Sequence, residues 1–238
     1  MKTLLNQTLT LQNGETISYL LEHRPRRTVG LKITANGLVV HAPKRLFAHQ
    51  LNQILQDKSG WIIKKLQLRD DNKVDKIQWL DGEQLLYLGQ DITLKLVMAN
   101  KKSMHFERNV LAIQAPNHHI NETCSRMVLA WYKKQAAQDF TRRIEVFAAK
   151  LGVPSPPISL SNAQSRWGSC NSRGEIRLNW RLLQAPPHII NHVICHELAH
   201  LKQLNHSAQF YAVVEKLFPD YKLAEKELKT LSPQLHRM

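Results

Sequence analysis

Cysteine is scarce in this chain of 238 residues, which contains only three. Cys124, Cys170 and Cys195 are widely spaced, and an odd number of cysteines does not indicate a framework of disulfides. The first residues, MKTLLNQTLTLQNGE, lack the continuous apolar segment and the cleavage site of a secretory signal. These absences predict a protein of the reducing cytoplasm.

Long apolar runs are missing as well. No stretch approaches the roughly 20 apolar residues that a membrane-spanning helix needs, so we expect no membrane insertion. Acidic residues are few, since 19 Asp and Glu stand against 33 Lys and Arg, and the formal net charge is +14. This charge favours an anionic partner such as nucleic acid or a nucleotide. The basic residues form small groups without interleaved aromatics, a pattern more typical of a solvated surface than of a platform for single strands.

The hydrophobic pattern predicts an α+β fold. Short β-prone segments occupy 8–12, 16–21, 28–34 and 38–42, with an Asn-Gly turn between the last two. A helical period follows over about 47–69, and strands resume at 77–80, 84–88, 92–97, 104–107 and 110–114. We therefore expect a β-rich N-terminal region with one long helix over residues 1–115, with a boundary in the segment 115–119.

Residues 120–238 have a different pattern, mostly helical. A long helix is expected over 123–151, where Gly152 and a group of prolines end it. Further expected elements are strands at 158–161 and 175–180, a helix over about 188–203, and two helices that begin after Ser207 and near Pro219.

The helix expected at 188–203 contains the pattern His-Glu-x-x-His, from His196 to His200. Residues four apart on a helix lie about 40° from each other around its axis, so both imidazoles leave the same face. Two neutral imidazoles can bind one Zn²⁺, and Glu197 beside them can accept a proton from an activated water. The pattern therefore predicts a zinc site with Glu197 as its general base.

A catalytic zinc needs a third protein ligand and an open position. His206 follows His200 by six residues, as in the longer metzincin pattern, although Gln203 stands where that pattern has Gly. Asn205 can make the turn instead, because Asn tolerates left-handed geometry. Glu215, on the next predicted helix, is the competing ligand. We favour His206, since a third histidine beside the motif otherwise has no explanation.

Other readings of the same motif stay open. A helix can carry these histidines by chance, and a zinc with four protein ligands would be structural in a DNA- or protein-binding module. The apolar residues around the motif and the presence of His206 favour the catalytic interpretation. His192 lies a turn away and is expected to be structural.

Several segments resemble the YgjP-like metallopeptidases, a bacterial family, and the resemblance covers nearly the whole chain. They are SRWGSC at 165–170, GEIRLN at 174–179, VICHELAHLKQLNH at 193–206 and FPDY at 218–221. The resemblance implies a zincin-like domain over 120–238 in which His196, His200 and His206 bind zinc and Glu197 is the base. The related SprT-like and Wss-type proteases act on protein bound to DNA.

The remaining site candidates lie around this motif. Arg166 can bind a substrate carboxylate or phosphate, or stabilise an oxyanion. Asn179 and Tyr211 are candidates for substrate contacts. Gly168 is expected to allow a close backbone approach and Trp167 to pack the sheet against the helix. The strand at 175–180 is expected to be the edge on which an extended peptide adds.

These observations predict a zinc metallopeptidase that hydrolyses peptide bonds in a peptide or protein substrate. Two alternatives use the same residues. One is a metal-dependent hydrolase of nucleotide phosphoanhydrides, and the other is a protease or binding module that associates with DNA through its basic surface.

Overall fold

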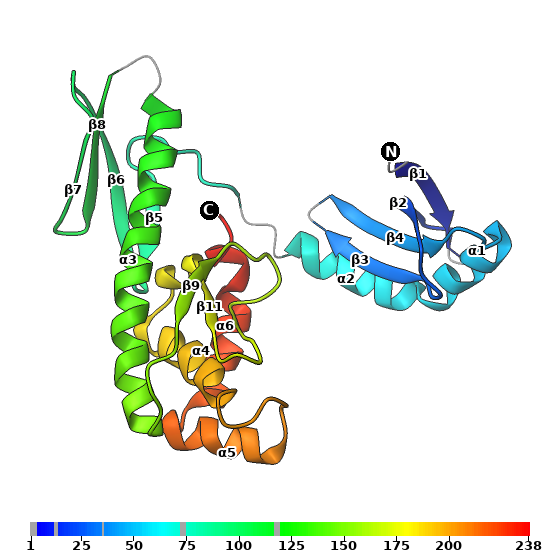
Figure 1. The fold of residues 1–238 in the computed structure, drawn as a ribbon. Helices are drawn as coiled ribbons and strands as arrows, with labels where there is room; N and C mark the ends of the chain where they lie inside the picture. Colours follow the sequence, from blue (N-terminus) through cyan, green and yellow to red (C-terminus); the bar gives the residue numbers. More distant parts are fainter. Residues whose placement is uncertain (1–3, 12–13, 35, 72–74, 117–119) are drawn as a thin grey trace. The chain divides into compact units, whose positions relative to one another are not determined.

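The structure, a computed structural model, describes residues 4–11, 14–34, 36–71, 75–116 and 120–238 (Figure 1). The chain forms two compact units, Met1–Lys73 and Val74–Met238, and each combines sheet and helix, so the α+β fold is confirmed. This division differs from the boundary expected at 115–119, of which residues 117–119 lie outside the described part.

The first unit is a mixed four-stranded sheet covered by two helices. The strand order is β1-β2-β4-β3, with β2 and β4 parallel and the outer pairs antiparallel. Alternate side chains of β4 point inward, and Leu38 and Val40 meet Leu55 and Ile62 of the helices in one apolar core. The single helix expected over 47–69 is divided at Lys58, directly before Ser59 and Gly60. The elements are β1 (Leu4–Thr10), β2 (Thr16–Arg24), β3 (Gly30–Thr34), β4 (Gly37–Pro43), α1 (Ala48–Asp57) and α2 (Ser59–Asp71).

A second sheet, in the order β5-β6-β8-β7, begins the second unit. Its strands are β5 (Gln84–Tyr87), β6 (Gln90–Met98), β7 (Ser103–Glu107) and β8 (Val110–Ala115). The strand expected at 77–80 is wrong, because this segment is irregular and Trp79 has a φ of 60°.

This second sheet shares its core with the long helix α3 (Ile120–Leu151). Leu111 and Ile113 of β8 are fully buried in one cluster with Val128 and Tyr132 of α3. The Tyr132 hydroxyl also donates a hydrogen bond to the Leu86 carbonyl oxygen at 2.7 Å. Residues 75–115 therefore belong to the same body as the histidine motif, which explains where the two units divide.

A third, small sheet lies beside the motif helix. Its order is β10-β11-β9, so β11 is bonded on both sides. The edge expected at 175–180 is therefore wrong, and β10 is one of the two free edges. β10 was not predicted because a three-residue strand has no readable period. The strands are β9 (Ile158–Ser161), β10 (Gly168–Cys170) and β11 (Ile176–Asn179).

The motif helix α4 (Pro187–Ala199) lies at the centre of the second unit and contacts α3, α5, α6 and β10. Its buried face includes Ile190, Ile194 and Leu198, so it is apolar enough to be an interior helix. Pro187 occupies the first turn as predicted. The helix was expected to end at about Gln203, and it ends four residues earlier. Ser207 caps α5 (Ala208–Leu217) as expected, accepting a hydrogen bond from the Phe210 amide at 3.4 Å, and α6 (Tyr221–Leu235) follows.

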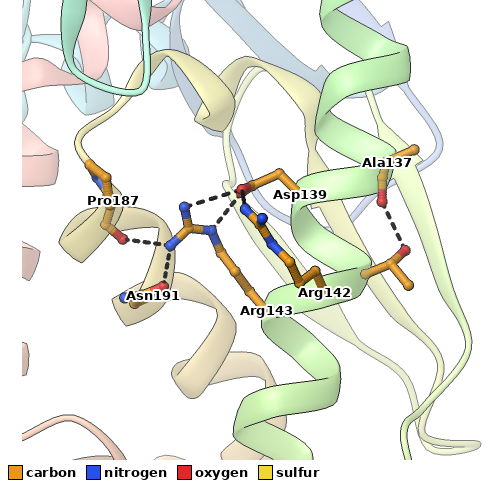
Figure 2. Close-up of polar contacts among 7 residues, drawn as sticks. Ala137, Asp139, Arg142, Arg143, Pro187 and Asn191 are labelled. Carbon is orange, nitrogen blue, oxygen red and sulfur yellow. Dashed lines mark hydrogen bonds and ion pairs between the residues drawn. The ribbon is translucent and has the colours of Figure 1, made fainter.

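Arg143 of α3 links an ion pair within its own helix to a hydrogen bond with the motif helix, and Figure 2 shows these contacts. Arg143 donates from Nε to Asp139 Oδ2 at 2.5 Å and from a terminal nitrogen to Asn191 Oδ1 at 2.6 Å. Asp139 is 8% exposed, and it also accepts a hydrogen bond from Arg142 at 2.9 Å. Since Asn191 precedes His192 by one residue, this contact holds α4 against α3 one turn before the motif.

We expect Asp139→Asn to destabilise the protein by about 1.5–3 kcal/mol, because a hydrogen-bonded charge is lost and the half-buried Arg143 is left without it. Urea unfolding would measure the difference. Arg142→Ala is the matched control, since its side chain is 73% exposed and its removal should cost less than about 0.5 kcal/mol. Equal losses in the two variants would contradict the assigned role of Asp139.

Candidate metal centre

Three histidine rings converge where α4 ends. His196 lies in the last turn of α4, His200 is the residue that caps it, and His206 comes from the loop before α5. One ring nitrogen from each lies within 4.8 Å of the others, and the Nε2 atoms of His196 and His206 are 3.1 Å apart. This cluster can hold a metal ion, and Glu215, which is exposed, is not part of it.

The turn after α4 brings His206 back over the helix. The amides of Lys202 and Gln203 both donate to the Ala199 carbonyl oxygen at 3.0 Å, so the chain reverses directly after the helix. Among the described non-glycine residues, positive φ occurs only at Trp79, Leu88, Arg108 and Asn109. The expected left-handed turn at Asn205 is therefore wrong, and no glycine is needed at Gln203.

The ring of Phe210 packs against all three histidine rings. It is fully buried, and its ring centroid lies 4.9 Å from His196, 4.6 Å from His200 and 4.8 Å from His206. An aromatic ring in this place limits the rotation of each imidazole and so keeps the three nitrogens together. Nothing in the sequence indicates this role, because an apolar residue at this position of α5 is equally typical of an ordinary core.

The protonation of the cluster fits metal binding. Burial, together with the charges of His200 and His206, lowers the pKa of His196 to about 4, and burial also lowers the pKa of His200. Only the neutral imidazole binds a metal, so this environment favours the binding form. The Nδ1 atom of His200 lies 3.1 Å from the Gln203 carbonyl oxygen, where it donates a hydrogen bond and leaves Nε2 for a metal.

The distance between two of the ring nitrogens also fits zinc. A tetrahedral zinc with nitrogen ligands at about 2.0–2.1 Å places two of those nitrogens about 3.3 Å apart. The separation of 3.1 Å between His196 and His206 is close to this value. Three imidazoles also match the ligand number of a catalytic zinc site, which leaves one position open.

Glu197 lies beside the cluster in an apolar setting. Only 5% of it is exposed, and this burial raises the pKa of its carboxyl group to about 7, while the positive charge of Arg166 opposes the shift. A carboxyl group with a pKa near neutrality can both accept and return a proton.

Gly168 of β10 packs directly against Glu197. A Cβ atom at position 168 would lie 2.6 Å from Glu197 Cγ and 2.7 Å from its Cδ, so a larger residue would displace this carboxylate. The close approach predicted for Gly168 is confirmed, and its partner is the carboxylate of the motif.

We expect Gly168→Ala to lower kcat of any Glu197-dependent reaction by about 100-fold, because a shift of about 1 Å in a reacting group costs that much. Steady-state kinetics would measure the loss, and metal content should stay unchanged. Gly60→Ala is the control, since a Cβ there meets no atom within 4 Å. Full activity of the Gly168 variant would show that the position of Glu197 is unimportant.

Asn179 was expected to contact the substrate, but its side chain lies inside the fold. It is fully buried, its Nδ2 donates to the Ala163 carbonyl oxygen at 2.7 Å, and its Oδ1 accepts from the Arg181 amide at 3.1 Å. Its side chain therefore holds the loop that leads to β10. Asn179 supports the site from within the fold.

Arg166 and Tyr211 both lie near the cluster. Arg166 is exposed and close enough for its charge to act on Glu197. Tyr211 is partly exposed, with its ring 6.3 Å from that of His206 and stacked on Tyr221 at 5.9 Å. Trp167 packs on the C-terminal segment, where its ring stacks on His236 at 4.6 Å and its indole nitrogen donates to Ser232 at 3.2 Å.

A sequence model of the YgjP-like metallopeptidase domain matches residues 27–231. The chain belongs to the YgjP-like metallopeptidase family. The resemblance seen in the motifs is thereby confirmed. Family membership and the histidine cluster together imply a metal ion, and a metallopeptidase family implies protein substrates.

Two solved structures are also similar to this chain. One is the metallopeptidase zymogen abylysin of Pyrococcus abyssi, with 27% identity, a TM-score of 0.36, and coverage of 38% of this chain and 92% of that one. The other is the metallopeptidase zymogen jannalysin of Methanocaldococcus jannaschii, with 21% identity, a TM-score of 0.35, and coverage of 40% and 96%. A search of curated proteins found no match.

Two further expectations were that the cysteines form no disulfides and that no helix crosses a membrane. Cys124, Cys170 and Cys195 carry free thiols, and burial raises the pKa of Cys195 to about 12, so it acts as a small apolar residue of the core. Within the described segments, none of the helices has both the length and the apolar character to cross a bilayer.

Proposed function

We propose that this YgjP-like protein is a zinc peptidase whose catalytic unit is the second unit, with His196, His200 and His206 as metal ligands and Glu197 as general base. The observation that carries the proposal is the convergence of three ring nitrogens within 4.8 Å beside a buried carboxylate. Three neutral imidazoles suit zinc better than magnesium or calcium, which prefer oxygen ligands.

The proposed reaction is hydrolysis of a peptide bond. A bound zinc ion polarises the peptide carbonyl and lowers the pKa of water to about 7. Glu197 takes one proton from the attacking water as the new C–O bond forms. The same carboxyl group then gives that proton to the leaving nitrogen as the C–N bond breaks, so its protonation is unchanged at the end.

Two further side chains have places in this proposal. Arg166 and Tyr211 are exposed near the cluster and can donate hydrogen bonds to the oxyanion that develops on the carbonyl oxygen. The free edge of β10 offers backbone groups to an extended peptide, and Gly168 at its start lies against Glu197.

A substrate comparison tests the proposal. Zinc-loaded protein is incubated with casein, with mixed peptides and with nucleoside triphosphates, and products are followed by mass spectrometry and phosphate release. Cleaved peptides that disappear on chelation and return with zinc are the expected result. Phosphate release without peptide cleavage would support the phosphoanhydride hydrolase in place of the peptidase.

The same experiment with added duplex DNA tests the remaining alternative. The net charge of +14 supports an anionic partner, and stimulation of proteolysis that weakens steeply with salt would assign DNA that role. We also propose a cytoplasmic location, supported by the three free thiols.

A further inference from the structure

A small cavity opens beside Glu197, on the side of the metal centre that faces α6. It has a volume of about 180 Å³, and its lining includes Trp167, His192, Val193, Glu197, Glu225 and Leu228. His196 also borders it, so one metal ligand and the general base both face the same space. Ligand pockets for whole small molecules are usually about 300–1,000 Å³, so this cavity is the size of a single side chain.

One part of the cavity wall is apolar. Val193 and Leu228 are buried, and the half-buried Trp167 lies across from them, held in place by Ser232 and His236. Such walls suit the aliphatic part of a substrate side chain. Because Trp167 is fixed from the C-terminal segment, the cavity exists before any substrate binds.

Glu225 places a negative charge at this cavity. It is exposed on α6, and among the described residues it has no hydrogen-bond or ion-pair partner, although its charge acts on His192 in the same cavity wall. Glu227, two residues further along the helix, differs because it lies 2.8 Å from His188 Nε2 and does not line the cavity. The Glu225 carboxylate can therefore accept hydrogen bonds from a cation that enters from outside.

His192 adds a second unmet polar group. It is 5% exposed, and its Nδ1 atom is buried without a hydrogen-bond partner in the described part of the chain. Buried polar atoms in proteins are nearly always hydrogen-bonded, so an orphan atom on a residue that lines a cavity points to a ligand that supplies the partner.

We propose that this cavity is the subsite for a substrate residue next to the scissile bond, and that Glu225 makes it select arginine or lysine. The inference rests on the proposed peptidase function and names its substrate class. The aliphatic stem of a basic residue contacts Val193 and Leu228, while its charged end meets the Glu225 carboxylate.

The charge of a second cavity agrees with a basic substrate residue beside Glu225. It borders His200 and has a volume of about 430 Å³, and Arg173 and Lys202 line it. The two cavities share no lining residue, and their charges are opposite. A basic side chain is therefore disfavoured in the second cavity and favoured beside Glu225.

The test compares peptides on zinc-loaded protein. The peptides are identical except for the residue on either side of the cleaved bond, which is arginine, lysine, leucine or glutamate. On one side of the bond, we expect kcat/KM to be highest for arginine and lysine, with the preference carried by KM. In Glu225→Gln the ratio of arginine to leucine peptides should fall about five-fold, the upper range for a partly exposed charge pair. In Glu225→Lys the preference should shift to glutamate.

Glu227→Gln is the matched control, because it removes a carboxylate from the same helix outside the cavity and should keep the arginine preference. An arginine-to-leucine ratio that is unchanged in Glu225→Gln would overturn the proposal, even if peptides are hydrolysed. A binding measurement separates this failure from failure of the peptidase function. Labelled peptides on zinc-loaded Glu197→Gln protein should bind with the same preference and the same dependence on Glu225, whether or not any peptide is cleaved, and equal binding of all peptides would also overturn it.

Discussion

Glu197→Gln should keep one bound metal ion per chain and lose peptide hydrolysis by about 10²–10⁴-fold, the contribution of a positioned general base. The change is nearly isosteric, so the carboxamide occupies the same buried place against Gly168. It cannot accept a proton from water, and it does not touch the three histidines as a ligand. Metal content by mass spectrometry and kcat by peptide assay measure the two halves of the expectation.

Glu215→Gln is the control for this variant. It removes a carboxylate from the next helix, on an exposed residue outside the histidine cluster, and should change neither metal content nor turnover. Full activity of the Glu197 variant would show that Glu197 is not the general base. Loss of the metal together with activity would instead make Glu197 a structural support of the site.

His206→Ala should lose both the metal and the activity, because it removes one of three ligands from a site that has no fourth histidine to replace it among the described residues. The Nε2 atoms of His196 and His206 are 3.1 Å apart, so the remaining pair can bind zinc only weakly. Zinc titration with a competing chelator would measure the affinity, and thermal unfolding with and without zinc would show the lost stabilisation.

The rival ligand makes this experiment decisive for the third position. If Glu215 completed the site, Glu215→Gln would lose zinc and His206→Ala would retain it. We expect the opposite, since the exposed Glu215 lies outside the cluster that Phe210 holds together.

Much of this site could be predicted from the sequence because it is local. His196 and His200 are one helical turn apart, so their shared face follows from helix geometry alone. The apolar residues around them indicated an interior helix, and Ser207 marked the start of the next one. The α+β fold followed in the same way from periods of two and of about 3.6 residues.

The rest depended on contacts between distant segments. Gly168 meets Glu197, and Asn191 meets Arg143, across long separations in the sequence. The order of a sheet is set by pairings of this kind, which is why β11 was expected at an edge and lies in the middle. The division of the chain after residue 73 also depends on a distant contact. The strands of the second sheet have an apolar face, but their sequence does not show that this face packs on α3.

The sequence also could not distinguish support from contact with substrate. Asn179 lies at the end of a strand near the motif, as a substrate-binding residue would, yet its amide group is hydrogen-bonded inside the fold. From the sequence, Phe210 is an ordinary core residue, yet its ring packs against the three imidazoles. Both roles follow from the positions of neighbours that only the folded chain brings together.

The most direct test of the account is to measure metal content and peptide hydrolysis on the same samples of wild-type protein, Glu197→Gln and His206→Ala. We predict one zinc and full activity in the first, one zinc and little activity in the second, and neither in the third. Peptide hydrolysis by a metal-free wild-type sample, or undiminished hydrolysis by both variants, would contradict the account.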